Sequence, residues 1–566
     1  MSDTSSSESS SPESSSPESS SAGKQPTLAV DIKDLESGAT RTWSEAVRAF
    51  LHPRVLAIFV LGISAGIPYL LIFGTLSVWL REAGVERSTV TFFSWAILGY
   101  SFKFVWAPVI DTLPLPWLTN KMGRRRSWLL VSQFAVIGSL VWMAVNDPVQ
   151  SLALTAVGAV LLGFSAATQD ITLDAYRIEA VHRDLQAMMS SAYIAGYRIG
   201  MLLTGAGALK LASYFGSGSD AYSHRAWALS YLCMAACMGI GVITTFLIQE
   251  PEVAEREASR WSSTDYVRFV ALFLCAAGVF IAGFVFSADG SAAAKAWLAE
   301  DVGMMERLGA FLVESARLLG SVVLAGVAAR ILVAGRLVPD GMVRESYVEP
   351  VTDFISRFGR SGLLILLLIG TYRISDLVMG AVANVFYIDH GYTKDQIADI
   401  AKTFGVFMTL LGGFLGGVFS VRFGLIRTLF IGALSAAASN LLFALLATMS
   451  NDVWMLVVVI TADNLAMGFA SAAFIAYLSS LTSIRFTATQ YALFSSLMTL
   501  FPKIVAGYSG SMVDRMGYPS FFTLTALMGV PVLLLIVLVS RIETGDPDAP
   551  PEADDTADDD TAAASA

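Results

Sequence analysis

Charged residues are scarce in this chain. Of its 566 residues only 15% are Asp, Glu, Lys or Arg, whereas 55% are apolar. Soluble domains carry about a quarter charged residues, so the composition excludes an ordinary water-soluble protein. Apolar runs of about 20 residues recur, and each is long enough to cross roughly 30 Å of hydrocarbon as a helix. The sequence therefore predicts an all-α polytopic membrane protein.

Cysteine and histidine are also rare, with three and four residues. The cysteines, Cys233, Cys237 and Cys275, fall in apolar stretches, so we expect packing residues rather than redox centres. The histidines fall at helix ends or in loops. The sequence contains no His-Glu-x-x-His, no Cys-x-x-Cys and no phosphate-binding loop. We therefore expect no enzyme, no metal site and no cofactor.

Fourteen membrane spans are predicted from the apolar runs. They cover approximately residues 55–80, 89–111, 127–145, 150–176, 187–214, 225–248, 266–287, 307–335, 361–388, 395–420, 425–447, 452–480, 487–513 and 518–540. Basic residues crowd the connection after the second span and the connection before the ninth. Because Lys and Arg are retained in the cytoplasm, we expect both termini on that side.

Short matches at nearly one offset indicate an internal duplication. Gly163–Phe164 recurs at Gly468–Phe469, and the stretch Ser190–Arg198 matches Ser495–Lys503 in its paired serines and terminal cation. Duplicated halves around a central site are a transporter architecture. The predicted organisation is a disordered Ser/Glu-rich tail (1–50), a six-helix bundle (51–250), a two-helix insertion with cytoplasmic linkers (251–358), a second six-helix bundle (359–542) and an acidic disordered tail (543–566).

Two acids and a base follow the apolar part of the fourth span. In "TQDITLDAYRIEA", Asp170, Asp174 and Arg177 share one helix face. A carboxylate in a bilayer costs a few kcal/mol, so such residues usually have a partner or a function. One or both acids could simply pair with Arg177. Alternatively, Asp170, which lies a turn deeper beside Gln169, binds a transported proton while Asp174 pairs with Arg177.

Cations in the spans of both halves predict a positive central cavity. Arg198, Arg373 and Lys503 lie deepest in their spans, and Lys103 adds to them. Such a cavity would suit a substrate with carboxylates or phosphates. The alternative is that each cation pairs with a local acid; Asp376, three residues after Arg373, is well placed for this.

The connection "DTLPLPWLTNKMGRRR" resembles the loop signature of the major facilitator superfamily. Asp111 ends the second span, and Arg124, Arg125 and Arg126 begin the third. The resemblance implies that an acid–base pair here holds a cytoplasmic gate. The matching connection of the second half departs from the pattern, because Gly416 stands about where the acid would be. The basic cluster is also what positive-inside topology alone would produce.

Longer stretches resemble the AmpG-type muropeptide permeases of this superfamily. They include "FKFVWAPVID", "ATQDITLDAY" and "FTATQYALFSSL", and the resemblance spans about residues 50–540. It implies a bacterial inner-membrane importer of anhydromuropeptides, driven by protons, which serves peptidoglycan recycling and β-lactamase induction. It also implies two helices beyond the usual twelve. On this reading Gln169, Gln490 and Tyr491 could donate hydrogen bonds to sugars.

Two other functions remain open at this point. The acetyl-coenzyme A transporters are related, and their anionic cargo would also suit a positive cavity. A membrane sensor or scaffold that does not transport is a different class, against which the paired charges on both halves speak. We expect a muropeptide and the lipid bilayer as partners, no nucleic acid, and a monomer.

Overall fold

The computed structural model describes residues 49–72, 74–86, 90, 93, 98–181, 185–217, 222–251, 261–301, 306–393 and 396–541. These residues form helices and no strands, as predicted. The two predicted tails lie almost entirely outside them.

The helices fall into two halves joined by an insertion and a linker. The first half contains α3 (Pro53–Ile72), α4 (Gly74–Glu82), α6 (Leu98–Phe102), η3 (Lys103–Val105), α7 (Ala107–Thr112), α8 (Leu118–Met122), α9 (Arg124–Val145), α10 (Leu152–Glu179), α11 (Gln186–Tyr214), α12 (His224–Cys237) and α13 (Gly239–Leu247). The insertion contains α14 (Ser263–Phe286), α15 (Ala288–Glu300) and α16 (Glu306–Ala334). The linker contains α17 (Asp340–Val343), η5 (Arg344–Val348) and α18 (Glu349–Phe358). The second half contains α19 (Ser361–Thr371), α20 (Ile374–Asp389), η6 (Ile397–Phe404), α22 (Gly405–Phe423), α23 (Leu425–Leu446), α24 (Val453–Leu481), α25 (Thr487–Ala506), α26 (Ser509–Leu527) and α27 (Gly529–Ser540).

Eleven helices among the described residues are long and apolar enough to cross a membrane. The multi-pass architecture is therefore confirmed, whereas the count of fourteen stays a prediction. Helices α11 and α25 coincide with predicted spans but are not among the eleven, and part of the predicted span 89–111 lies outside the described residues. One of the eleven, Ser509–Ser540, contains non-helical Gly517 with φ of 74°, which falls between the last two predicted spans.

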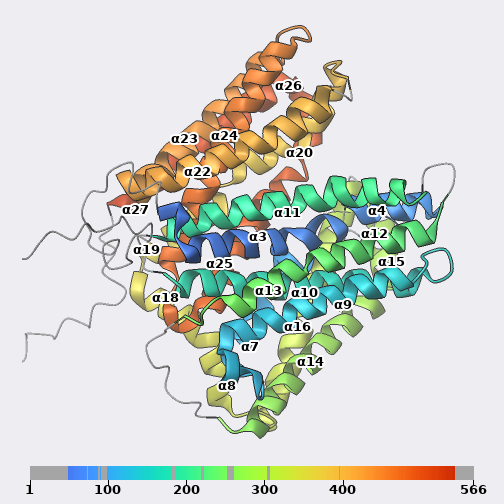
Figure 1. Ribbon diagram of the computed structural model, residues 1–566, viewed down its shortest axis with the longest axis vertical. Helices are drawn as coiled ribbons and strands as arrows, with labels where there is room; N and C mark the ends of the chain where they lie inside the picture. Colours follow the sequence, from blue (N-terminus) through green and yellow to red (C-terminus); the bar gives the residue numbers. More distant parts are fainter. Residues whose placement is uncertain are drawn as a thin grey trace, which may run out of the picture.

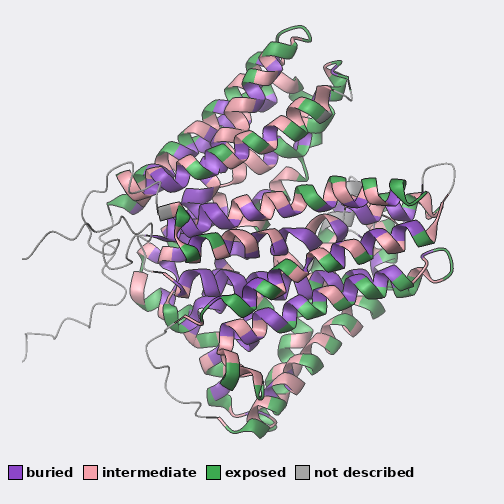
Figure 2. Cartoon of the chain, viewed as in Figure 1, coloured by how far each residue is buried: buried purple, intermediate pink, exposed green. Residues whose placement is uncertain are grey.

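The insertion differs from the two halves in its burial. Figure 2 shows that α14 and α16 are mostly exposed or intermediate, whereas buried residues are concentrated on α3 and α10. The exposed apolar side chains of α14 and α16 include Leu274, Ile281, Val323 and Ile331. In a bilayer these side chains would face lipid, because apolar surface of this extent is unfavourable in water.

Glycines let helices approach until their backbones touch. A Cβ atom on Gly66 of α3 would lie 2.1 Å from the carbonyl oxygen of Tyr197 on α11, and one on Gly200 would lie 2.2 Å from the carbonyl of Ile63. In the second half, a Cβ on Gly412 of α22 would lie 2.1 Å from the carbonyl of Leu465 on α24. Small residues at this spacing drive helix association in membranes.

Gly66→Ala should therefore destabilise the first half by about 1–3 kcal/mol, since the new methyl group meets backbone that cannot move aside. Thermal unfolding in detergent would measure this as a lower midpoint. Gly138→Ala on α9 is the matched control, because nothing lies within 4 Å of a Cβ there. Equal midpoints for the two variants would contradict the packing described.

The two halves meet at one end of the molecule. Helix α11 contacts α22 and α24, and α25 contacts α7 and α10. Figure 1 shows α22 and α24 beside α11 near the start of α11 and diverging from it toward its other end. We call the end where the halves meet, which contains Asp111 and the beginning of α25, the closed end.

Candidate functional site

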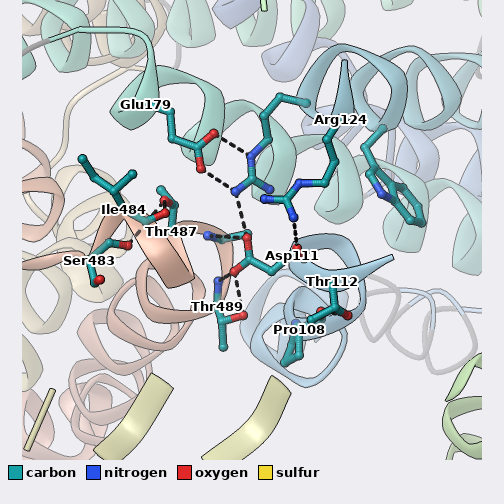
Figure 3. Close-up of polar contacts among 12 residues, drawn as sticks. Pro108, Asp111, Thr112, Arg124, Glu179, Ser483, Ile484, Thr487 and Thr489 are labelled. Atoms are coloured by element: carbon teal, nitrogen blue, oxygen red, sulfur yellow. Dashed lines mark hydrogen bonds and ion pairs between the residues drawn. The ribbon is translucent and has the colours of Figure 1, made fainter. Parts of the chain in front are cut away.

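Asp111 connects the two halves at the closed end (Figure 3). Its side chain is buried at the end of α7, in the first half. One carboxylate oxygen accepts from the backbone N–H and the hydroxyl of Thr489, at 2.7 and 2.8 Å. The other accepts from Arg125 at 2.8 Å. Because Thr489 lies in the first turn of α25, the carboxylate satisfies free N–H groups at a helix N-terminus, where negative charge is favoured.

Arg125 is held by a second acid that the sequence analysis missed. Glu179, at the end of α10, accepts from the Nε and Nη2 atoms of Arg125 at 2.9 and 2.5 Å. The Arg125 side chain is only 1% exposed. A buried guanidinium needs such paired carboxylates to offset its desolvation. Only the fold shows that the two acids, 68 positions apart in the sequence, meet at one Arg.

The three arginines of the predicted gate have different roles. Arg124 donates to the backbone carbonyl of Asp111. Arg126 instead donates to the carbonyl oxygens of Thr245 and Phe246, at 3.1 and 3.0 Å, and so ties α9 to the end of α13. In this conformation Asp111, held by Arg125, makes the contact to the second half. The described hydrogen bonds of the Arg126 side chain stay within the first half.

Glu250 fixes the beginning of α9. Its carboxylate accepts from the backbone N–H groups of Arg125 and Arg126 at 2.7 and 3.0 Å. Burial raises the pKa of this carboxyl, although the two N–H groups oppose the shift. The arrangement caps α9 and thereby fixes the position from which Arg125 reaches Asp111.

Deeper along α10, Asp174 is paired with two cations. Its carboxylate lies 3.2 Å from Lys103 and 3.6 Å from Arg177. The predicted pairing with Arg177 is therefore present. Arg177 also donates to Ser479 of the second half at 3.0 Å, and its guanidinium lies 5.2 Å from the ring centre of Tyr491. Lys103 and Tyr491, both predicted to bind substrate, are buried and engaged in this network.

Asp170 has a different environment, one turn away. Its side chain is buried, and one carboxylate oxygen accepts from the hydroxyl of Tyr193 at 3.4 Å. Among the described residues no cation lies within 4.0 Å of it. Its neighbour Gln169 is fully buried and donates to Ser64 at 3.2 Å. Asp170 is thus a buried carboxylate without an ion pair, unlike Asp174.

Arg198 of the first half and Arg373 of the second half are electrostatic neighbours. Arg198 lies on α11 and Arg373 at the junction of α19 and α20. In the part of the chain that the structure describes, neither has an acid within 4.0 Å. Asp376 interacts with Arg373 electrostatically but forms no such close pair. Two like charges therefore lie near each other here, and no described acid forms a close ion pair with either of them.

Two other predicted contacts lie elsewhere. Lys503 is exposed and donates a long hydrogen bond to Ser101 at 3.5 Å. The structure therefore shows no described interaction that links Lys503 to Arg198. Gln490 donates to the carbonyl of Pro350 and to Asp353, both at 2.8 Å, and accepts from Arg357 at 3.0 Å. In this conformation Gln490 anchors the linker helix α18 to α25, and sugar binding by it would require these bonds to break.

Gln490→Leu is expected to loosen the linker without weakening substrate binding, because it removes the hydrogen bonds to Pro350 and Asp353. Limited proteolysis should cut the linker (340–358) more than about threefold faster, a lost buried hydrogen bond being worth roughly 1 kcal/mol. Gln150→Leu, at an exposed position outside the linker, is the control. Weaker substrate binding with unchanged proteolysis would restore the predicted role in sugar binding.

The chain resembles known transporters along most of its length. Residues 354–562 match the Major Facilitator Superfamily, and residues 55–225 match the family described as Acetyl-coenzyme A transporter 1. A transporter named AmpG 4 from Rickettsia conorii is 29% identical over 493 residues, which cover 87% of this chain and 98% of that protein. The anhydromuropeptide permease of Escherichia coli K12 is 27% identical, over 88% of this chain and 81% of the permease.

Solved structures support the same fold. A fucose:proton symporter of E. coli aligns with a TM-score of 0.55 at 11% identity, covering 88% of this chain and 100% of the symporter. A proton:xylose symporter aligns with a TM-score of 0.51 at 14% identity, covering 86% of this chain and 94% of the symporter. At these identities the likeness concerns the fold alone. The relatives and the fold are those of transporters rather than enzymes, and together these likenesses support a major facilitator permease of the AmpG type.

Proposed function

We propose that this protein imports anhydromuropeptides, N-acetylglucosaminyl-1,6-anhydro-N-acetylmuramyl peptides, from the periplasm to the cytoplasm of a bacterium. The observation that carries this is the similarity to a permease named for anhydromuropeptides over 88% of the chain. The protein would lie in the inner membrane with both termini in the cytoplasm, as its basic connections favour. Its cargo would feed peptidoglycan recycling and β-lactamase induction.

Transport would proceed by alternating access of the two halves. The closed end would be the cytoplasmic end, held by Asp111, Arg125 and the first turn of α25. Arg198 and Arg373 would bind a carboxylate of the cargo, since neither forms a close ion pair with an acid among the described residues. Asp170 would carry the driving proton, and no cofactor would be needed.

A second cargo is favoured by one specific observation. Residues 55–225 match a family described as an acetyl-coenzyme A transporter, and this segment contains Asp170 and Arg198. The phosphates of coenzyme A would suit a pair of arginines as well as carboxylates do. The two cargoes differ in chemistry, because only the muropeptide has sugar rings joined to a peptide with several carboxylates.

The test is uptake of labelled anhydromuropeptide into proteoliposomes, with both cargoes added as competitors. Unlabelled anhydromuropeptide should reduce uptake by more than half at a concentration where acetyl-coenzyme A has no effect. Competition by acetyl-coenzyme A alone would favour the second cargo. Absence of uptake for both, in vesicles shown to contain folded protein, would favour a sensor or scaffold.

A further inference from the structure

Tyrosine rings gather on the side of the first half where Asp170 and Arg198 lie. Tyr69 of α3 packs edge-on against Tyr100 of α6, with ring centres 5.7 Å apart, and against Tyr197 of α11, at 6.0 Å. Tyr197 in turn lies 5.8 Å from Tyr193, one turn earlier on α11. We call these four residues, which come from three helices, the tyrosine wall.

The tyrosine wall adjoins the two groups that the transport cycle needs. The hydroxyl of Tyr193 donates to Asp170 at 3.4 Å. Tyr69 is an electrostatic neighbour of Arg198 and Arg373, and therefore of both halves, as well as of Asp170. Tyr193 is buried, whereas Tyr69, Tyr100 and Tyr197 are partly exposed. The wall thus lies near both the proposed proton site and the two arginines.

Two further features indicate that the tyrosine wall binds a ligand. The hydroxyl of Tyr100 is buried and makes no hydrogen bond of good geometry among the described residues, its one hydrogen-bonding neighbour being the side chain of Tyr197 in the same wall. A buried hydroxyl without a well-formed hydrogen bond is costly, and a ligand or a water molecule would satisfy it. In addition, a tyrosine has an apolar face and a polar tip, so a cluster of them suits a molecule that is itself apolar on its faces and hydroxylated at its edges.

We propose that the tyrosine wall is the sugar subsite of the transporter. A pyranose ring presents C–H groups on its faces and hydroxyl or amide groups at its edge. It would pack its face on Tyr69 and Tyr197 and bond its edge to the Tyr100 hydroxyl, while Arg198 and Arg373 take a carboxylate of the attached peptide. This inference rests on the proposed function and adds a division of the cargo into a sugar site and a peptide site.

Proximity to Asp170 gives the subsite a second consequence. A sugar on Tyr197 would lie next to Tyr193, whose hydroxyl is the hydrogen-bond donor to Asp170. Occupation of the sugar site can therefore change the environment of the proton site through one side chain.

The experiment uses two fragments of the cargo as probes: the anhydro-disaccharide without peptide, and the stem peptide without sugar. Binding of each to the purified full-length protein is measured by its effect on the midpoint of thermal unfolding across a concentration series. Tyr69→Leu should weaken the disaccharide about tenfold, as expected for loss of one stacked ring, and leave the peptide unchanged. Arg198→Gln should do the reverse. Tyr69→Phe keeps the ring and should retain most of the disaccharide affinity.

The outcomes separate the subsite from the transport function. If Tyr69→Leu and Tyr197→Leu leave disaccharide binding unchanged, or weaken both fragments equally, the sugar subsite is wrong while muropeptide import stands. If the unaltered protein binds neither fragment and does not take up whole muropeptide, the proposed function fails and the subsite fails with it. The unfolding midpoint of each variant without ligand shows whether it is folded.

Discussion

Replacing Asp170 by Asn should abolish accumulation of muropeptide against a gradient while leaving exchange between equal pools intact. Asp170 is buried, accepts one hydrogen bond from Tyr193 and has no cation within 4.0 Å among the described residues. Burial disfavours the charge of a carboxylate, so such a group can take a proton when open to the acidic side and release it when its surroundings rearrange. Asn has the shape of the protonated acid but cannot release a proton.

The measurement is the ratio of internal to external substrate in proteoliposomes with an inside-alkaline pH gradient. We expect the unaltered protein to exceed a ratio of one and the variant to stay near one, while counterflow of labelled substrate continues. Asp463→Asn on α24 is measured in parallel as a second membrane acid, since Asp463 also accepts a single described hydrogen bond, from Ser439 at 3.2 Å. Accumulation by Asp170→Asn would move the proton site elsewhere, with Asp463 or Asp376 as the next choice.

Asp174→Asn should behave differently from Asp170→Asn. It would leave Lys103 and Arg177 without their carboxylate in a buried network that also contacts Ser479 of the second half. Removing one member of a buried pair typically costs about 3–5 kcal/mol. We therefore attribute a structural role to Asp174, and loss of folded protein in this variant would say nothing about proton transfer.

Asp111→Asn should open the closed end. The substitution removes the charge that binds Arg125 at 2.8 Å and weakens the cap on α25 at Thr489. Breaking a buried ion pair costs roughly 3–5 kcal/mol. If only half of that energy stabilises the closed conformation over the open one, its loss shifts the closed–open equilibrium by more than about tenfold. Net transport should fall, because the state that this contact stabilises is then rarely populated.

A cysteine reporter can measure this shift. Ser191 is buried on α11, where it faces Gly417 of α22 in the second half. In a background without the three native cysteines, Ser191→Cys should react with a maleimide much faster after Asp111→Asn. Arg126→Gln is the control, because the described hydrogen bonds of the Arg126 side chain go to Thr245 and Phe246, within the first half. Equal labelling in Asp111→Asn and its parent would contradict the role of Asp111.

Much of the fold could be predicted because span length and apolar composition are local properties. The third span begins at Arg124, where Gly123 adopts a positive φ of 82°, and the predicted turn before the last span falls at Gly517. Asp111 and Arg125 were also predictable, because an acid and a basic cluster flank one short connection. Each of these signals is contained in a few neighbouring residues.

The rest of the site depends on tertiary contacts that no local pattern encodes. Glu179 and Thr489 meet Asp111 and Arg125 from distant parts of the chain. A hydrogen bond from Gln490 to the sugar stays a prediction, and only the fold shows that the linker α18 uses its amide group in this conformation. The tyrosine wall gave no signal either, since tyrosines in apolar helices do not reveal which helix they face.

Lys503 and Arg373 illustrate a limit of the internal repeat. The matched serines predicted that Arg198 and Lys503 would act as a pair. In the structure the electrostatic neighbour of Arg198 in the second half is Arg373, whereas Lys503 is exposed and contacts Ser101. Repeats fix equivalent positions in two halves, but they do not determine which positions face each other when the halves meet at one end. Substrate binding by Lys503 stays a prediction.

Proton movement driven by the cargo tests the central claim most directly. A pH-sensitive dye is enclosed in proteoliposomes without a pH gradient, and anhydromuropeptide is added outside. We expect the interior to become more acidic in step with uptake, and this response to be absent in Asp170→Asn. Uptake of muropeptide into the vesicles with no change of internal pH would contradict a proton-coupled importer.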